Sequence, residues 1–239
     1  MNIKYLGLLI IFLIFFISCS DDENPSSPEN QTAKELSLKV IDIPNAIKQS
    51  SNPYAQQVNV FTTLANSFSV YSFYFTPPSG NQQFLKVNED WTKSWTVNNI
   101  TINMNYFENT TDFGWSIYLS GTDGEQTFNN TLFLEAQETI GTQQGTFKIY
   151  DPNSNTVASE WTYFTTTSDV YNLSLFSYNG DNSNKLEIIS NNDNSGEFTY
   201  YEMASGDFTI DKRVAWNADG TGQWWEYDSA GTLIDSGSF

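Results

Sequence analysis

Hydrophobic and polar residues alternate along most of the chain after residue 83. Successive side chains of a β-strand point to opposite faces of the sheet, so this alternation is typical of strands with one buried face. Turn-forming pairs such as Asp123-Gly124, Asn179-Gly180 and Asp219-Gly220 separate several of the segments. The predicted strands are 83–88, 91–97, 99–107, 112–120, 126–137, 144–150, 156–164, 169–177, 184–190, 196–203, 207–216, 221–228 and 232–239.

No helical pattern interrupts this run of strands, which argues against the β-α-β units of a parallel sheet. We therefore expect a mainly β fold, an antiparallel meander of about twelve strands preceded by an N-terminal helical segment. A single sheet of that length has to curl, close or split. An open barrel, a closed barrel and a curled sheet are the alternatives that the sequence leaves.

Residues 35–80 carry the helical signals. Asn52 suits the N-cap of a helix and Pro53 its first position. From Tyr54 to Phe75, apolar side chains recur every three or four residues and form one stripe. The aromatic side chains of this stripe could hold a ligand, but we expect them to pack against the sheet. Residues 77–80 (PPSG) should end the helix.

Three segments, 145–151, 196–202 and 222–228, share the pattern Gly-x-aromatic-x-x-Tyr-acid. Alternation places the first aromatic residue of each on one face of its strand and the Tyr on the other. The first face is more apolar and is expected to face the core. In a meander these strands run in the same direction, so their Tyr residues and acids should lie at one end of the sheet. The simpler explanation is that each Gly opens a turn and each acid, Asp151, Glu202 and Asp228, begins one.

Trp224 and Trp225 are neighbours on one predicted strand, so they must point to opposite faces. If Trp224 lies in the core, Trp225 lies on the second face. Flat aromatic rings on a sheet surface are well suited to stacking on sugars. The alternatives are that the helix covers this second face or that it lines a lumen. The candidate ligand-binding residues are therefore Trp225, Tyr227, Tyr201 and Tyr150.

The composition excludes several kinds of chemistry. Ten Lys and Arg residues face 28 Asp and Glu residues, a net charge of −18. Nucleic acid is therefore not expected as a partner, because its binding depends on Lys and Arg contacts to phosphates. The sequence has no histidine, which excludes His-dependent triads and His-ligated zinc. Cys19 is the only cysteine, so no disulfide can form within the chain.

Two acidic patterns are candidate sites. Asn191-x-Asp193-x-Ser195-Gly196, with Glu202 at the twelfth position, approximates a calcium loop, although a strand is predicted where a second helix should begin. We expect no cofactor, with Ca²⁺ at Asn191, Asp193 and Glu202 as a weak alternative. The carboxylate pairs that a glycosidase would need are Glu226 with Asp228 and Glu197 with Glu202.

The first residues predict a targeting signal rather than part of the fold. Residues 1–18 contain Lys4 and then an apolar run too short to span a membrane, as in a signal peptide. Residues 16–19 (FISC) resemble a bacterial lipobox, with Phe16 where Leu is commoner, and residues 20–23 (SDDE) are similar to the acidic surface-export signal of Bacteroidota lipoproteins. The resemblance implies lipidation of Cys19, a membrane partner through that anchor, and exposure on the cell surface at the outer membrane.

Residues 19–34 then form the lipidated Cys and a flexible linker, because Pro, Ser and Asn dominate them. The helical segment 35–80 and the β domain 81–239 are expected to form one globular unit. The function expected first is a non-enzymatic surface module that binds a glycan or a protein partner. One alternative is a carrier of an apolar ligand under the helix, similar in outline to the open barrels of periplasmic lipoprotein carriers. The other is a glycosidase.

Overall fold

The computed structural model describes residues 34–75, 85–87, 90–124, 126–204 and 206–239. The leader, Cys19 and the predicted helix stop at 77–80 lie outside these ranges. The described residues belong to one compact unit. Within the described part of the chain, no helix is long and apolar enough to cross a membrane.

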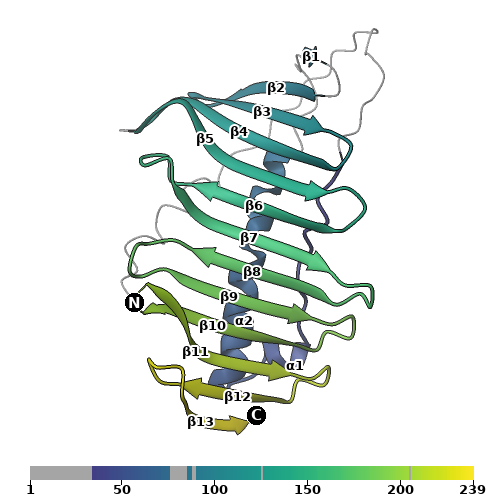
Figure 1. Cartoon of the computed structure of the whole chain (residues 1–239), viewed down its shortest axis with the longest axis vertical. Helices are drawn as coiled ribbons and strands as arrows, with labels where there is room; N and C mark the ends of the chain where they lie inside the picture. The colour runs from purple at the N-terminus through teal and green to yellow at the C-terminus, as the bar shows by residue number, and fades with distance from the viewer. Residues whose placement is uncertain (1–33, 76–84, 88–89, 125, 205) are drawn as a thin grey trace. The chain divides into compact units, whose positions relative to one another are not determined.

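In the described part of the chain, thirteen strands form one antiparallel sheet in which each strand pairs with its neighbours in the sequence (Figure 1). They are β1 (Leu85–Val87), β2 (Asp90–Val97), β3 (Ile100–Glu108), β4 (Asp112–Asp123), β5 (Gln126–Thr139), β6 (Gln144–Tyr150), β7 (Val157–Thr165), β8 (Tyr171–Ser177), β9 (Asn184–Ser190), β10 (Gly196–Ala204), β11 (Asp207–Trp216), β12 (Gly222–Tyr227) and β13 (Leu233–Ser238). The predicted meander is confirmed. Strands β1 and β13 are the two edges, so the sheet is open and the closed-barrel alternative was wrong.

The helical segment precedes the sheet, as predicted. It contains α1 (Asn45–Lys48), α2 (Pro53–Ala65) and the 3₁₀ helix η2 (Asn66–Phe75). The Asn52 side chain accepts hydrogen bonds from the backbone N–H groups of Tyr54, at 2.9 Å, and Ala55, at 3.4 Å. These bonds satisfy amides that have no partner within the helix, and Pro53 follows at the first position, so the predicted helix start is confirmed.

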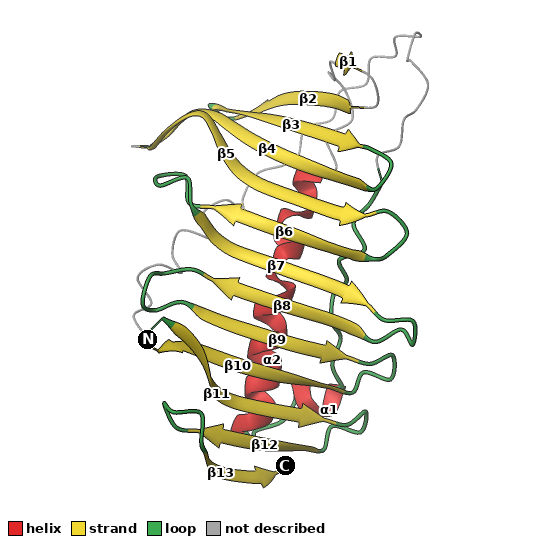
Figure 2. Cartoon of the chain, viewed as in Figure 1, coloured by secondary structure: helices red, strands yellow, loops and turns green. Residues whose placement is uncertain are grey.

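Helices α2 and η2 cross the strands on one face, which we call the inner face; in Figure 2 they lie behind the sheet. Aromatic contacts mark the crossing, and from the start of α2 to the end of η2 they run from β12 back to β6. They are Tyr54 stacked on Trp224 of β12 at 4.0 Å, Phe61 near Phe198 of β10 at 4.8 Å, and Tyr71 near Phe147 of β6 at 6.1 Å. Trp161 of β7 donates a hydrogen bond from its indole N–H to the backbone oxygen of Ala65 at 3.0 Å.

Residues 34–43 form a second crossing of the inner face, which we call the N-terminal strap. The strap has no regular secondary structure, so the helical conformation predicted for 35–80 was wrong for this part. Its amide at Lys39 donates to the Tyr171 hydroxyl of β8 at 3.2 Å, and its side chains at Ile41 and Ile43 are buried. Alternating apolar residues in the strap pack on the sheet, so the inner face is covered by the strap as well as by the helices.

The face assignment made from the repeats is confirmed. Phe147 and Phe198 are each 1% exposed on the inner face, whereas Trp224 is half-buried. The proposal that each repeat Gly opens a turn was wrong. Each Gly lies in a strand and leaves room for an aromatic ring from the adjacent chain segment, because a Cβ there would approach the ring closer than 3.0 Å. The Gly–ring pairs are Gly145 with Tyr163, Gly196 with Trp216 and Gly222 with Phe239.

Candidate binding face

The opposite face of the sheet, here called the outer face, carries the candidate site. The strand registers align one residue from each of β5 to β12 as direct cross-strand partners. We call this line the central row; it consists of Gln137, Thr146, Thr162, Ser174, Glu187, Thr199, Arg213 and Trp225. Four of its members, Thr146, Thr162, Ser174 and Thr199, have short hydroxyl side chains. Two adjoining grooves form a depression that follows this row across the strands.

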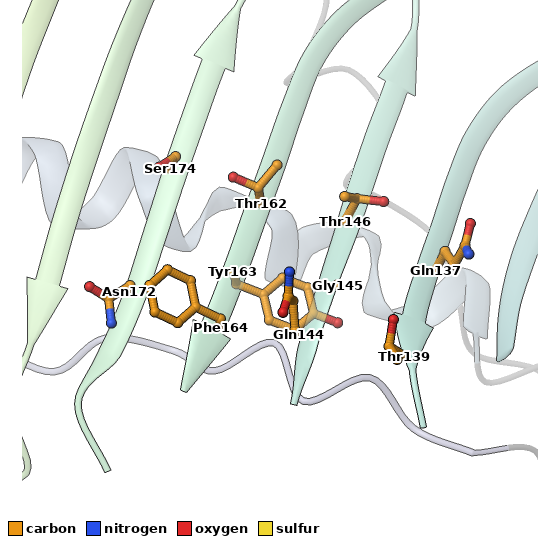
Figure 3. A pocket seen from close by; sticks show the side chains of 10 residues that line it. All are labelled: Gln137, Thr139, Gln144, Gly145, Thr146, Thr162, Tyr163, Phe164, Asn172 and Ser174. Atoms are coloured by element: carbon orange, nitrogen blue, oxygen red, sulfur yellow. The ribbon is translucent and has the colours of Figure 1, made fainter. Parts of the chain in front are cut away.

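Two grooves lie on this face. Groove A has a volume of about 390 Å³ and spans β5 to β8 (Figure 3). Its ten lining residues carry no charge: Gln137, Thr139, Gln144, Gly145, Thr146, Thr162, Tyr163, Phe164, Asn172 and Ser174. In a chain with a net charge of −18, an uncharged lining of this size favours a polar but neutral occupant.

Groove B has a volume of about 500 Å³ and extends from β7 to β12. Phe164 and Ile189 stand on one side of it, with 46% and 41% of their surface exposed, and Tyr201 and Tyr227 also line it. Exposed apolar side chains of this size, gathered around polar groups, are a feature of binding surfaces rather than of ordinary sheet surface.

Two bases on the outer face, Arg213 and Lys185, are each paired with an acid. Arg213 lies 2.5 Å from Glu197 and Lys185 lies 3.0 Å from Glu187. The Glu197 hydrogen bond raises the pKa of Arg213. Because each base has an acid beside it, the charges of groove B are neutralised locally.

Tyr201 and Tyr150 are each held in position by an acid. Tyr201 donates a hydrogen bond to Glu187 at 2.8 Å, and the Lys185 ammonium lies 3.9 Å from the centre of the Tyr201 ring. Burial, and then the bond to Glu187, raise the pKa of Tyr201 to about 12. Tyr150 is bonded in the same way to Glu135. A ring positioned before the ligand arrives loses less entropy on binding.

The structure brings together three of the four predicted ligand-binding residues. Tyr201 and Tyr227 line groove B, and Trp225 lies on the same face with the Arg213 guanidinium 4.8 Å from its ring. Tyr150 lies on β6, four strand spacings from β10, or about 19 Å away. Tyr150 is therefore too far from the other repeat Tyr residues to share one site with them.

The predicted calcium ligands are separated. Asp193 lies in the turn between β9 and β10, where its carboxylate accepts hydrogen bonds from the amide and hydroxyl of Ser195 at 2.9 and 2.6 Å. Asn191 donates to the same hydroxyl. Glu202 lies six residues further along β10 than Gly196, about 20 Å away. Among the described residues, no three His, Cys, Asp or Glu side chains gather as a metal site would require.

The contacts of the predicted glycosidase carboxylates do not support either pair. Glu226 lies on the inner face, where it accepts a hydrogen bond from Tyr54 at 3.2 Å, whereas Asp228 accepts bonds from the backbone of its turn. Glu197 and Glu202 point to opposite faces of β10. Asp151 also accepts bonds within a turn, as the simpler explanation of the repeat acids predicts, whereas Glu202 lies within β10 and begins no turn.

Residue patterns did not identify Phe164, Asn172 or Arg213 as groove residues. Alternation predicted the face of each, but only the cross-strand register shows which residues of different strands are neighbours. Searches against protein-family models and curated proteins found no match. The geometry of the outer face is therefore the basis for assigning a function.

Proposed function

We propose that the protein is a lipid-anchored module of the cell surface whose outer sheet face binds carbohydrate without transforming it. The observation that carries the proposal is the position of groove A, lined by uncharged residues, beside groove B with its exposed rings. Both grooves lie on the face that the helices and the strap leave open.

A carbohydrate fits these groups chemically. Asn, Gln, Ser and Thr side chains both donate and accept hydrogen bonds, as sugar hydroxyls do. The aromatic rings of Tyr201, Tyr227 and Phe164 offer flat apolar surfaces for the C–H faces of a sugar ring. Tyr supplies such contact area at a low cost in conformational entropy.

The carrier alternative is less well supported. A carrier of this outline would hold its apolar ligand between the helix and the sheet. Here the rings of Tyr54 and Phe61 pack directly on the inner face, at 4.0 Å from the Trp224 ring and 4.8 Å from the Phe198 ring. The glycosidase alternative is also weaker, because Glu187 and Glu197 serve as partners of neighbouring bases.

Substitution of Tyr227 with alanine is expected to weaken carbohydrate binding at least about tenfold, or about 1.4 kcal/mol. The reason is that the ring lines groove B and its loss removes a stacking surface. Binding can be measured on a glycan array and then by calorimetry with the best glycan. Tyr118→Ala is the matched control, since this Tyr lies on β4, outside both grooves. Equal affinity of wild type and Tyr227→Ala for every glycan that binds would contradict the proposed site.

Anchoring is tested separately from binding. Cys19→Ala is expected to move the protein from the membrane fraction to the soluble fraction, because Cys19 is the only residue that a lipobox would acylate. Buried acyl chains provide the binding energy of such anchors. Ser27→Ala, in the predicted linker, should remain in the membrane fraction. Membrane retention of Cys19→Ala after a carbonate wash would rule out the lipid anchor.

A further inference from the structure

The two grooves adjoin one another. Phe164, Asn172 and Ser174 line both, so the depression continues from β5 to β12 without a change of face. Seven strand spacings of about 4.8 Å give a length of about 34 Å. A path of this length exceeds what a single sugar would occupy.

The residues that surround the depression show that it runs across the strands. Thr146, Thr162 and Ser174 are direct partners on β6, β7 and β8, and these short side chains form its floor. Phe164 rises on one side of the floor, and Phe176 lies on the other, one row away. Figure 3 shows Thr146, Thr162 and Ser174 on adjacent strands, with Gln144, Phe164 and Asn172 grouped nearer one end. An elongated ligand would therefore lie across the strands rather than along them.

The charges along this path indicate the class of ligand. Groove A is lined by uncharged residues, and the three charged residues of groove B, Glu187, Glu197 and Arg213, all take part in ion pairs. A polyanionic ligand would be repelled by a chain with a net charge of −18. A cationic ligand would compete with Lys185 and Arg213 for the carboxylates. A neutral ligand disturbs none of these pairs.

We infer that the ligand is a linear, neutral polysaccharide that lies across the strands along the central row and occupies both grooves. This inference rests on the proposed function and deepens it, because it specifies the class, direction and extent of the carbohydrate. At one sugar ring per strand spacing, the path holds on the order of seven rings. The floor hydroxyls bond to the part of the chain in groove A, and the rings of groove B stack on the other part.

The test is calorimetry of the mature protein with neutral linear oligosaccharides of increasing length, namely gluco-, xylo- and manno-oligosaccharides. The association constant is expected to rise at least about tenfold from the shortest to the longest member of the series that binds, and then to level off. A triple variant, Thr146→Val, Thr162→Val and Ser174→Ala, keeps the shape of the floor but removes its hydroxyls. It should lose at least about tenfold in affinity for long members and leave short members unaffected.

The matched control is Thr96→Val with Thr101→Val, a hydroxyl pair on β2 and β3 outside both grooves. It should bind like the wild type. Affinity that does not depend on length, a triple variant that binds long members normally, or a preference for uronic-acid oligosaccharides would overturn the inference and leave the proposed function standing. Failure of every glycan to bind, on the array and by calorimetry, would overturn both.

Discussion

Replacing Phe198 with alanine is expected to lower the free energy of unfolding by about 3–5 kcal/mol, the usual cost of removing a buried aromatic ring. Phe198 is 1% exposed and lies on the inner face of β10. The ring of Phe61 in α2 lies 4.8 Å from it, centre to centre, so the substitution removes contacts to the helix as well as to the sheet. The loss would be a large part of a typical stability of about 5–15 kcal/mol.

The measurement is denaturant unfolding followed by far-UV circular dichroism. The matched control is Thr199→Ala, the next residue on the same strand, which points to the outer face. Its effect is expected to stay within about 1 kcal/mol, because Thr199 is only half-buried and contributes less packing than a buried ring. Similar losses for the two variants would mean that the two faces of β10 are buried to the same degree, which would contradict the assignment of the outer face as a surface.

The third repeat modifies the expectation drawn from the sequence. Trp224 occupies the position that corresponds to Phe198, but it is only half-buried, because β12 lies next to the edge strand β13. Its ring is covered on one side by Tyr54. Sequence equivalence between repeats therefore predicts which face a residue occupies and not how deeply it is buried. Depth depends on how far a strand lies from the edge of the sheet.

The local signals in the sequence predicted the elements well. Alternation located all thirteen strands to within a few residues, because it reflects the burial of one face of each strand. Asn52 and Pro53 located the start of α2, since capping depends on the backbone amides of the first turn alone. The same alternation predicted that the side chains of Phe147 and Phe198 point to the core.

The features that depend on long-range pairing could not be predicted. The register of β10 against β11 shifts between Tyr200 and Tyr201, and such a bulge changes which side chains meet across the strands. The strap was missed because its alternating apolar residues suit any extended segment that packs on a core. Nothing in the sequence indicated that Phe164 and Tyr227, which lie on β7 and β12, line one groove.

Glu138 shows how the strap is fixed to the sheet. This residue is 5% exposed on the inner face of β5. Its carboxylate accepts hydrogen bonds from the backbone amide and the hydroxyl of Ser37, at 2.5 and 2.7 Å, and from the Tyr163 hydroxyl at 2.7 Å. A buried carboxylate is tolerated only when its oxygens are satisfied in this way. The Glu138 carboxylate therefore links the strap to β7.

The Glu138→Ala variant is expected to lose about 2–5 kcal/mol of stability, because the Tyr163 hydroxyl and the Ser37 amide would both be left without their acceptor. The loss should be concentrated in the strap. Hydrogen exchange read by mass spectrometry should show faster exchange in residues 34–43 than in the wild type, while β9 to β11 change less. Gln137→Ala, the exposed neighbour on β5, is the control and should leave exchange in the strap unchanged.

The same contact predicts a dependence on alkaline pH. Burial, followed by the hydrogen bond to Glu138, raises the pKa of Tyr163 above its ordinary value of 10.0. A group whose pKa is raised by folding stabilises the fold fully below its unfolded pKa, and this contribution disappears as the pH rises through the folded value. Wild-type stability should therefore fall as the pH increases above about 10, and Glu138→Ala should show a weaker dependence. An equally steep fall in both proteins would show that the coupling of Tyr163 to Glu138 contributes nothing to stability at alkaline pH.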